Sequence, residues 1–279
     1  MTVFFYVPPP RPEPLPMRIA TWNVNSIKQR IDNLVAWLKE RQPDIVCLQE
    51  TKTTDDNFPR EPLEALGYNL AIHGQKTFNG VAILSKFPFD EVTPRLPGED
   101  GDDHARFIEA VVSTARGALR VASIYLPNGN PVQSEKYPYK MRWMDRLADY
   151  AGERLKLEED LILAGDYNVI PAAADVYEPE GWIEDALFRP QTREKFRALT
   201  HLGLTEAVRA SSDEPGLYTF WDYQAGCWQK NRGLRIDHIL LSPRAADTLE
   251  SAGIDKHVRA WEKPSDHVPV YIDLAIEPA

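Results

Sequence analysis

Apolar residues recur in short runs along the chain, and several of these runs end in polar side chains. Residues 18–25 read Arg-Ile-Ala-Thr-Trp-Asn-Val-Asn and predict a strand that ends in two asparagines. Ser26 is placed to cap a helix that Pro43 stops. The apolar stripe of this helix is formed by Ile27, Ile31, Leu34, Val35 and Leu38. Residues 44–49 then predict a second strand, which leads directly into Glu50.

The same patterns continue to the end of the chain. Strands are expected at residues 68–73, 80–85, 107–114, 118–125, 161–168, 235–241 and 268–274, with an aromatic, strand-like stretch at 218–223. Helices are expected at residues 62–66, 192–202 and 243–252, and around the stripe formed by Met141, Met144, Leu147, Ala151 and Leu155. Many strands with few helices between them indicate two packed sheets with helices outside.

The first residues differ from the rest. Residues 1–16 carry six prolines after a short apolar patch, and they predict an extended arm that precedes the domain. Residues 17–279 contain no internal repeat and no interior linker, so a single domain is expected there.

Composition narrows the classes of protein. The net charge of −10 argues against a protein that coats nucleic acid, although an enzyme with a local basic rim around a metal site stays possible. Cys47 and Cys227 are far apart and form no CxxC pair, which favours a reducing, cytoplasmic setting. No apolar run approaches the roughly 18 residues of a membrane span, so no membrane partner is expected. In the absence of a coiled-coil pattern, we expect a monomer.

Polar residues at the predicted strand ends form a chemically biased set. Carboxylates and amides suit Mg²⁺, which takes oxygen ligands, and a histidine beside an aspartate suits acid–base work or contact with a phosphate. Such a set around one cation would hydrolyse a phosphodiester. The members are Asn23, Asn25, Glu50, Tyr125, Asp166, Asn168, Asp237, Asp266 and His267.

Each member also has a purely structural interpretation. Asp166 and Asn168 could close a strand with an Asx turn, because these side chains bond their own backbone readily. Glu50 and Asn25 could shape a loop or cap a helix, and His267 could be a histidine at the start of a strand. Their joint occurrence favours one site.

Six blocks of sequence together resemble the exonuclease III family of apurinic/apyrimidinic endonucleases, within the endonuclease/exonuclease/phosphatase superfamily. The resemblance covers about residues 17–274, and the blocks occur in the family's order. They are Trp22-Asn23-Val24-Asn25, Leu48-Gln49-Glu50-Thr51-Lys52, Tyr125-Leu126-Pro127-Asn128-Gly129, Gly165-Asp166-Tyr167-Asn168, the run from Asn231 to His238, and Ser265-Asp266-His267.

The resemblance implies a four-layered α/β sandwich, with two packed mixed sheets flanked by helices. It also implies cleavage of double-stranded DNA on the 5′ side of abasic sites with Mg²⁺ or Mn²⁺, often with 3′–5′ exonuclease and 3′-repair activity on blocked ends. Glu50 would then be the principal metal ligand. Asn23, Asn25 and Asp266 would be further ligands of the metal, and Asp237 would lie nearby.

The resemblance assigns the catalytic roles as well. Asp166 would activate or position the attacking water, and Asn168 would orient that water or the phosphate. Tyr125 would contact the phosphate, and His267, oriented by Asp237, would stabilise its charge. Two departures matter. Some relatives carry aspartate where this chain has Asn25, which predicts a weaker second metal position. Secreted deoxyribonuclease I-like members have histidine where this chain has Tyr125.

Substrate contacts are expected in two groups. Phe220, Leu234 and Ile236, supported by Trp221, resemble an apolar pocket for a baseless sugar, although they could also be ordinary core. The polar group comprises Lys52, Lys76, Asn79, Asn128, Arg232 and Arg235, which could contact phosphates. Two alternatives remain: a phosphatase of the superfamily acting on a small phosphoester or inositol phosphate, and a catalytically silent binding protein.

Overall fold

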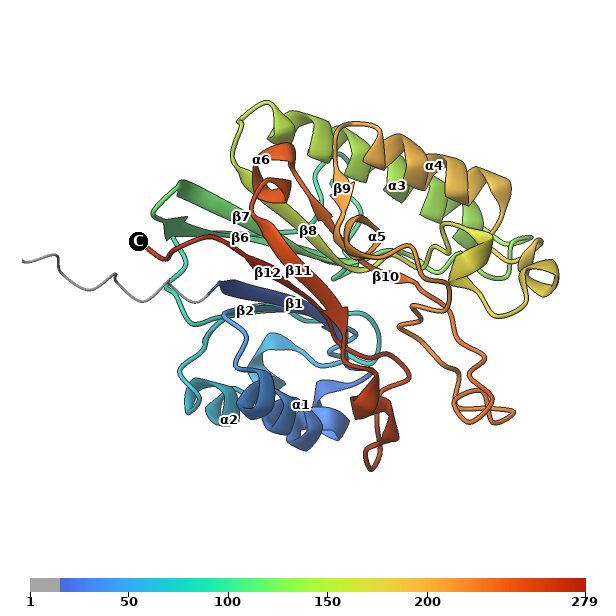
Figure 1. The fold of residues 1–279 in the computed structure, drawn as a ribbon, viewed down its shortest axis with the longest axis horizontal. Coiled ribbons are helices and arrows are strands. Elements are labelled where there is room, and N and C mark those ends of the chain that lie inside the picture. The colour runs from blue at the N-terminus through green and yellow to red at the C-terminus, as the bar shows by residue number, and fades with distance from the viewer. Residues whose placement is uncertain (1–15) are drawn as a thin grey trace, which may run out of the picture.

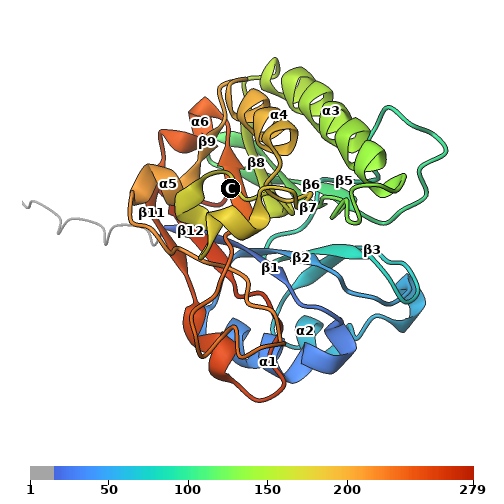
Figure 2. The same ribbon diagram turned by 90° about the vertical axis from the view of Figure 1, so that its right-hand side faces the viewer.

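Two six-stranded sheets pack against each other in the middle of the molecule, and helices cover their outer faces (Figure 1). The computed structural model describes residues 16–279, so the arm expected at residues 1–16 lies outside the described residues except for Pro16. Figure 2 shows the layers end-on, with α3 and α4 above the sheets and α1 and α2 below them. The expected four-layered α/β sandwich is confirmed.

The first sheet places two strand ends side by side. Its strands, in spatial order, are β11 (Leu249–Ile254), β12 (Val270–Leu274), β1 (Met17–Asn23), β2 (Ile45–Gln49), β4 (Val81–Ser85) and β3 (Asn69–His73). β1 and β2 are parallel, and Asn23 is paired with Gln49. The residues that follow both strands therefore emerge at the same edge of the sheet.

The second sheet brings three predicted site residues into one row. Its strands, in spatial order, are β5 (Glu91–Pro94), β6 (Phe107–Thr114), β7 (Gly117–Tyr125), β8 (Asp160–Asp166), β10 (Asp237–Leu241) and β9 (Thr205–Glu206). In the parallel pair β7–β8, Tyr125 is opposite Asp166. In the antiparallel pair β8–β10, Asp166 is opposite Asp237. The three side chains therefore start from neighbouring positions on one edge.

The main core lies between the sheets. Ile19 and Cys47 of the first sheet belong to the same buried cluster as Val121, Ile162 and Ile239 of the second. Alternation along each strand sends every second side chain into this layer. The remaining apolar side chains pack under the helices on the outer faces.

The helices use one apolar face each. The first sheet is covered by α1 (Ile27–Arg41) and α2 (Glu61–Glu64), and the second by α3 (Lys136–Leu155) and α4 (Pro190–Thr200). Shorter elements are α5 (Ala207–Ser211), α6 (Pro243–Ala246) and the 3₁₀ turns η1 (Asp55–Asn57), η2 (Ala173–Asp175), η3 (Pro179–Trp182) and η4 (Lys256–Ala260). Among residues 16–279, none of the helices has the length and apolarity needed to traverse a bilayer.

Three local predictions were wrong. The helix expected at residues 243–252 ends at Ala246, because Leu249–Ile254 pairs with β12 as an edge strand. The stretch 218–223 is not a strand, and Phe220 makes only isolated bridges to Leu234 and His267. Ser26 precedes α1, but its side chain makes no capping hydrogen bond, and its φ is 86°.

Candidate active site

Side chains from both sheets meet where the strands end. Glu50, Asp166 and His267 each offer a ligand atom, and these atoms lie within 4.8 Å of one another. Glu50 follows β2 of the first sheet, Asp166 ends β8 of the second, and His267 lies just before β12. The register of the strands thus places these residues together although they are far apart in sequence.

Asn23 links the two sheets at this point. Its Nδ2 donates hydrogen bonds of 2.9 Å to Glu50 Oε1 and of 2.9 Å to Asp166 Oδ2. Its Oδ1 accepts the backbone N–H of Asn25 at 3.0 Å. The amide therefore orients two carboxylates, which differs from the expectation that Asn23 offers its oxygen to a metal.

Asn25 and Asp266 form a separate pair beside the carboxylates. Asn25 Nδ2 donates to Asp266 Oδ1 at 3.0 Å, and Asn25 Oδ1 accepts a hydrogen bond from Lys52. Both residues were expected to be metal ligands. In the structure Asp266 Oδ1 and both polar side-chain atoms of Asn25 are already paired, and Asp266 is not among the acidic and histidine side chains that cluster with Glu50. The assignment of Asn25 and Asp266 as ligands stays a prediction.

Glu50 keeps its charge in this setting. Lys52 Nζ lies 2.7 Å from Glu50 Oε2. Burial raises the pKa of Glu50, but the charge of Lys52 and the hydrogen bond from Asn23 outweigh burial and lower that pKa below its usual value. Glu50 is therefore a carboxylate anion at neutral pH.

His267 is fixed by a chain of hydrogen bonds. Its Nδ1 lies 2.9 Å from Asp237 Oδ2, and the hydroxyl of Thr219 donates to the same carboxylate oxygen at 2.6 Å. Burial lowers the pKa of His267, but the charges of Asp237 and Asp166 outweigh it and raise the pKa to about 10. The ring is therefore a cation whose Nε2 lies 3.8 Å from Asp166 Oδ2.

Asp166 closes β8 with an Asx turn and belongs to the cluster as well. Its Oδ1 accepts the backbone N–H of Asn168 at 2.9 Å, while its Oδ2 accepts from Asn23. Burial raises the pKa of Asp166, and the charges of Asp237 and Glu50 raise it further. The positive charge of His267 lowers it, and the resulting pKa is about 7. The structural and the functional interpretations of this segment are thus compatible.

Asn168 and Asn128 join the loops that follow β8 and β7. Asn128 Nδ2 donates to Asn168 Oδ1 at 3.0 Å, and Asn168 Nδ2 donates to the Leu126 carbonyl at 2.9 Å. Asn168 is buried, whereas Asn128 is exposed. Of the two, Asn128 is the one with surface available for a substrate.

Tyr125 lies beside the cluster, and its ring is covered by Arg106, which was not among the predicted site residues. Arg106 Cζ is 4.8 Å from the centroid of the Tyr125 ring. Burial and the charges of Glu50 and Asp166 raise the pKa of the Tyr125 hydroxyl well above its usual value, so the phenol stays protonated. Arg106 also lines a groove beside Glu50, together with Lys52, Gln75, Phe78, Asn79 and His104.

Four residues at or beside the cluster have a left-handed backbone. Asn25, Glu50, Lys52 and Asn168 have φ values of 43°, 51°, 52° and 48°. This left-handed region is unfavourable for residues other than glycine, and such residues often mark functional sites. The surrounding hydrogen bonds stabilise these conformations and aim the side chains at one another.

The three residues predicted to line an apolar pocket lie together, but Leu234 and Ile236 are each only 2% exposed. Leu234 and Ile236 belong to one buried cluster, and Phe220 packs against it while remaining half-buried. The Phe220 and His267 rings meet edge to face, with their centroids 4.9 Å apart. Trp221 is fully buried and donates to Asn231 Oδ1, so it can only support the pocket from behind.

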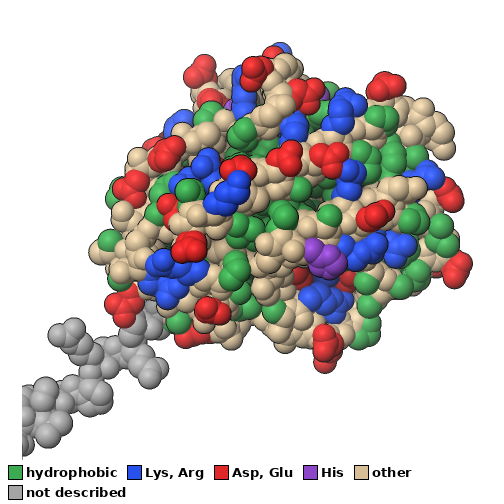
Figure 3. Space-filling view, turned by 90° about the horizontal axis from the view of Figure 1, so that it is seen from above, with side chains coloured by type: hydrophobic (Ala, Val, Ile, Leu, Met, Phe, Trp, Pro, Cys, Tyr) green, Lys and Arg blue, Asp and Glu red, His purple; other side chains and the backbone are tan. Residues whose placement is uncertain are grey.

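The predicted basic rim needs one correction. Arg235 is 1% exposed and forms ion pairs with Asp175 and Glu206, so it is a core residue and cannot contact phosphates. Arg232 is exposed near Tyr177, and Lys76 is exposed on the loop that carries Gln75 and Phe78. Figure 3 shows basic and acidic side chains interspersed over the α3–α4 face, which therefore offers no continuous basic surface.

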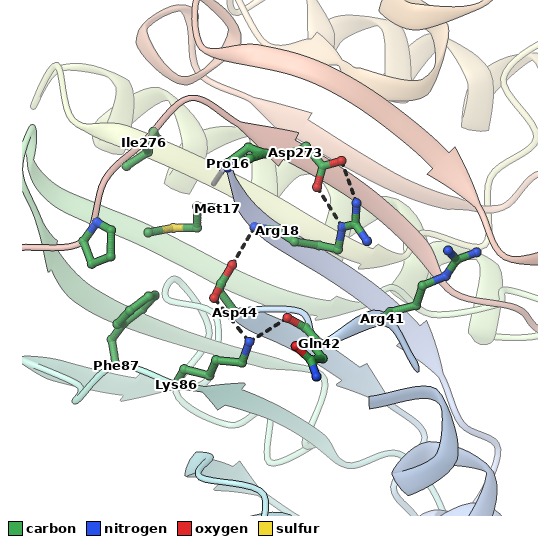
Figure 4. Close-up of a pocket in the computed structure, with 11 residues that line it drawn as sticks. Pro16, Met17, Arg18, Arg41, Gln42, Asp44, Lys86, Phe87, Asp273 and Ile276 are labelled. Carbon is green, nitrogen blue, oxygen red and sulfur yellow. Dashed lines mark hydrogen bonds and ion pairs between the residues drawn. The ribbon is translucent and has the colours of Figure 1, made fainter. Parts of the chain in front are cut away.

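Another hollow lies at the opposite end of the first sheet. It surrounds the start of β1 and is lined by Met17, Arg18, Lys86, Phe87 and Asp273, among others (Figure 4). Arg18 is paired with Asp273 at 2.7 Å, and Lys86 donates to the Gln42 carbonyl at 2.6 Å. Its basic groups already have partners, and β1 runs from this hollow to the cluster at Asn23. Its chemistry is therefore separate from that of the cluster.

The donor set at the cluster fits a hard divalent cation. Glu50 and Asp166 bring two carboxylates together, and oxygen ligands of this kind suit Mg²⁺ or Mn²⁺. Neither cysteine belongs to the group, and the one histidine uses its Nδ1 for Asp237. The pKa of Asp166 is raised mainly by burial and further by the charges of Asp237 and Glu50, and a cation between the carboxylates would offset both effects.

Comparison with known proteins gives one consistent answer. A model of the Endonuclease/Exonuclease/phosphatase family matches residues 20–267. The exodeoxyribonuclease III of Haemophilus influenzae is 32% identical over 266 residues, which cover 92% of this chain and 100% of that protein.

Two solved structures are similarly close. The 3′ phosphatase NExo from Neisseria, bound to a product DNA hairpin, has a TM-score of 0.89 and 39% identity over 92% of this chain and 99% of that one. An AP endonuclease from Archaeoglobus fulgidus has a TM-score of 0.87 and 35% identity over 92% and 99%. The chain therefore belongs to the endonuclease/exonuclease/phosphatase family, in its exonuclease III branch.

Proposed function

We propose that this protein is a divalent-metal-dependent DNA-repair phosphodiesterase that cleaves the backbone on the 5′ side of abasic sites. The observation that carries the proposal is the convergence of Glu50, Asp166 and His267 within 4.8 Å, next to the half-buried ring of Phe220. Hydrolysis of a phosphodiester needs a cation site, a group that accepts a proton and a fixed positive charge for the phosphate. The three side chains supply these functions.

The roles follow from charge and position. Glu50 and Asp166 would hold the cation, with Asn23 orienting both carboxylates. When bound, Mg²⁺ would neutralise charge on the phosphate and acidify water. Asp166 would position the attacking water and take up its proton, because its Asx turn holds the carboxylate at the cluster, within 4.8 Å of the ligand atoms of Glu50 and His267.

The phosphate is met by two further groups. The cationic His267 donates from Nε2 to a phosphate oxygen, because its Nδ1 is occupied by Asp237. The protonated Tyr125 hydroxyl can donate to the phosphate or to the leaving oxygen. Asn168 contributes by fixing the loop that positions Asp166 and Asn128.

Substrate choice depends on the apolar surface beside His267. Phe220, packed on Leu234 and Ile236, suits a sugar that lacks its base, whereas a base would need polar partners that these three side chains do not offer. The names of similar proteins support DNA as the substrate: one is an exodeoxyribonuclease III and another an AP endonuclease. The 3′ phosphatase NExo supports an accompanying activity on blocked 3′ ends.

The test uses a duplex with a single tetrahydrofuran abasic analogue. We expect a nick on the 5′ side of the analogue in Mg²⁺ and no cleavage in EDTA. Glu50→Gln and His267→Asn should lower the turnover at least about 100-fold while remaining folded. Glu64→Gln removes a carboxylate from the exposed surface of α2 and should retain full activity.

The contrary results are equally specific. Release of phosphate from an inositol polyphosphate without nicking of the abasic duplex would assign the chain to the phosphatases of its superfamily. Metal-dependent cleavage that survives Glu50→Gln unchanged would remove Glu50 from the site.

A further inference from the structure

One buried lysine has no place in the scheme above. Lys140 lies in the first turns of α3 and has no exposed surface. It occupies the buried stripe of this helix, together with Met144, Leu147 and Ala151. A lysine is rarely buried completely unless its ammonium group has dedicated partners.

Its partners are the two loops that carry the candidate site. Lys140 Nζ donates to the Asn168 carbonyl at 2.6 Å and to the Asn128 carbonyl at 3.0 Å. These residues are also joined directly by their side chains. The ammonium group therefore closes a small network that connects the loop after β7 with the loop after β8.

The loop after β7 is shaped to admit this side chain. Gly129 has a φ of +91°, and a Cβ atom there would lie 2.7 Å from Lys140 Cδ. A residue other than glycine would therefore be strained and would press on the lysine stem. The Asn128-Gly129 turn and the buried lysine form one packing unit.

We propose that Lys140 is a positioning residue that holds Asn168, and through it the Asx turn of Asp166, in the geometry needed for hydrolysis. This inference rests on the proposed function, because it assigns a role in the same site. Asn168 has a left-handed backbone with a φ of 48°, and the hydrogen bond from Lys140 to its carbonyl fixes the peptide that follows. A shift of about 1 Å at such a position can cost about 100-fold in rate.

The charge of the lysine is compatible with this role. Burial lowers the pKa of Lys140 to about 7, against the opposing charges of Asp166 and Asp185. The amine offers N–H donors to both carbonyls in either protonation state, and the ammonium form is the stronger donor. Methionine is one atom shorter and offers no donor, so Lys140→Met removes the hydrogen bonds and preserves much of the packing of the stem.

The test is a double-mutant cycle on the abasic duplex. We expect Lys140→Met to lower kcat about 10- to 100-fold with little change in KM. In the Lys140→Met background, Asn168→Ala should cost less than a third of the fold-change that it costs alone, since both act through one unit. Hydrogen exchange of residues 167–170 should also become faster in Lys140→Met.

A matched control separates positioning from stability. Met144→Ala removes another buried side chain from the same stripe of α3, and its effect on kcat should be small and should multiply with that of Asn168→Ala. If Lys140→Met does not fold, Lys140→Leu, which also lacks a donor, takes its place. Multiplicative losses with Asn168→Ala, or unchanged exchange at residues 167–170, would overturn the proposal. If the wild-type protein cleaves no DNA, the proposed function fails, and the exchange measurement alone decides the role of Lys140.

Discussion

Single residues at the site act in pairs, in which one side chain orients the other. Asn23 donates to Glu50 and to Asp166, and Thr219 donates to the carboxylate that orients His267. Hydrogen bonds to charged groups are worth about 1.5–3 kcal/mol each, so the supporting residues matter for the rate almost as much as the groups that touch the substrate.

Thr219 offers the sharpest residue-level prediction. Thr219→Val keeps the shape of the side chain but removes the hydroxyl that donates to Asp237 Oδ2 at 2.6 Å. Asp237 then fixes the His267 ring less firmly, and we expect kcat/KM on the abasic duplex to fall about 10- to 100-fold. Thr219→Ser retains the hydroxyl and should stay within a few-fold of wild type. Equal rates for the valine and serine variants would show that the hydroxyl plays no part.

The residues of the carboxylate and histidine cluster could be predicted from the sequence, whereas the residues that support them could not. Asp166 and Glu50 come directly after apolar runs, where a charged side chain is costly unless it has a partner or a function. Thr219 and Arg106 carry no such signal, because their partners are distant in sequence and are brought close only by tertiary packing. Lys140 could have been noticed in the sequence, because it interrupts the apolar stripe that continues through Met144, Leu147 and Ala151.

Among the elements, the parallel pairs β1–β2 and β7–β8 decide where the site forms. Parallel strands deliver their carboxyl ends to one edge, which explains why Asn23 and Gln49, and Tyr125 and Asp166, are neighbours. The strongly apolar central strands were predictable. The edge elements β5, β9 and β11 were missed or assigned wrongly, because pairing with a neighbour outweighs their weak local preference.

The approach of β7 and β8 depends on Gly165. A Cβ atom there would lie 1.9 Å from the Ile124 carbonyl oxygen. Gly165→Ala should therefore lower the free energy of unfolding by about 1–3 kcal/mol or more. Gly152→Ala, in α3, meets no atom within 4 Å and should instead raise it by roughly 0.5–1 kcal/mol. Urea unfolding of both variants measures this contrast, and a neutral Gly165→Ala would contradict the close approach.

The start of α5 is tied to β10 through Glu206. This carboxylate accepts the Arg209 backbone N–H at 2.8 Å and forms an ion pair with Arg235 at 3.0 Å. Burial raises the pKa of Glu206, but Arg235 and His238 outweigh burial and lower it from 4.5 to about 2. The stabilisation is therefore present above about pH 4.5 and is lost as the pH falls towards about 2.

Because the pKa of Glu206 is lowered in the folded state, wild type and a variant without this carboxylate should respond differently to pH. The shift corresponds to about 3 kcal/mol at neutral pH. Wild type should lose more stability than Glu206→Gln between about pH 6 and about pH 3, as measured by urea midpoints. Parallel losses in the two proteins would mean that Glu206 titrates normally.

Across the whole molecule, the two sheets meet in an apolar core and, at one edge, in a cluster of charges. Glu50 comes from the first sheet and Asp166 from the second, and Asn23 donates a hydrogen bond to each. The apolar core could be predicted from the strand pattern. The distance between the two carboxylates could not, because it depends on how two sheets that lack a common strand are stacked.

A cation bound between these carboxylates should stabilise the stack as a whole. A ligand that binds only the folded state and is present at 100 times its Kd raises the free energy of unfolding by about 2.7 kcal/mol. We therefore expect saturating Mg²⁺ to raise the Tm by roughly 5–10 °C. Glu50→Gln should abolish most of this rise, whereas Glu64→Gln should retain it. Equal ionic strength in NaCl controls for screening. An identical rise in Glu50→Gln would place the cation elsewhere, because a shared site must lose affinity when one of its two carboxylates becomes neutral.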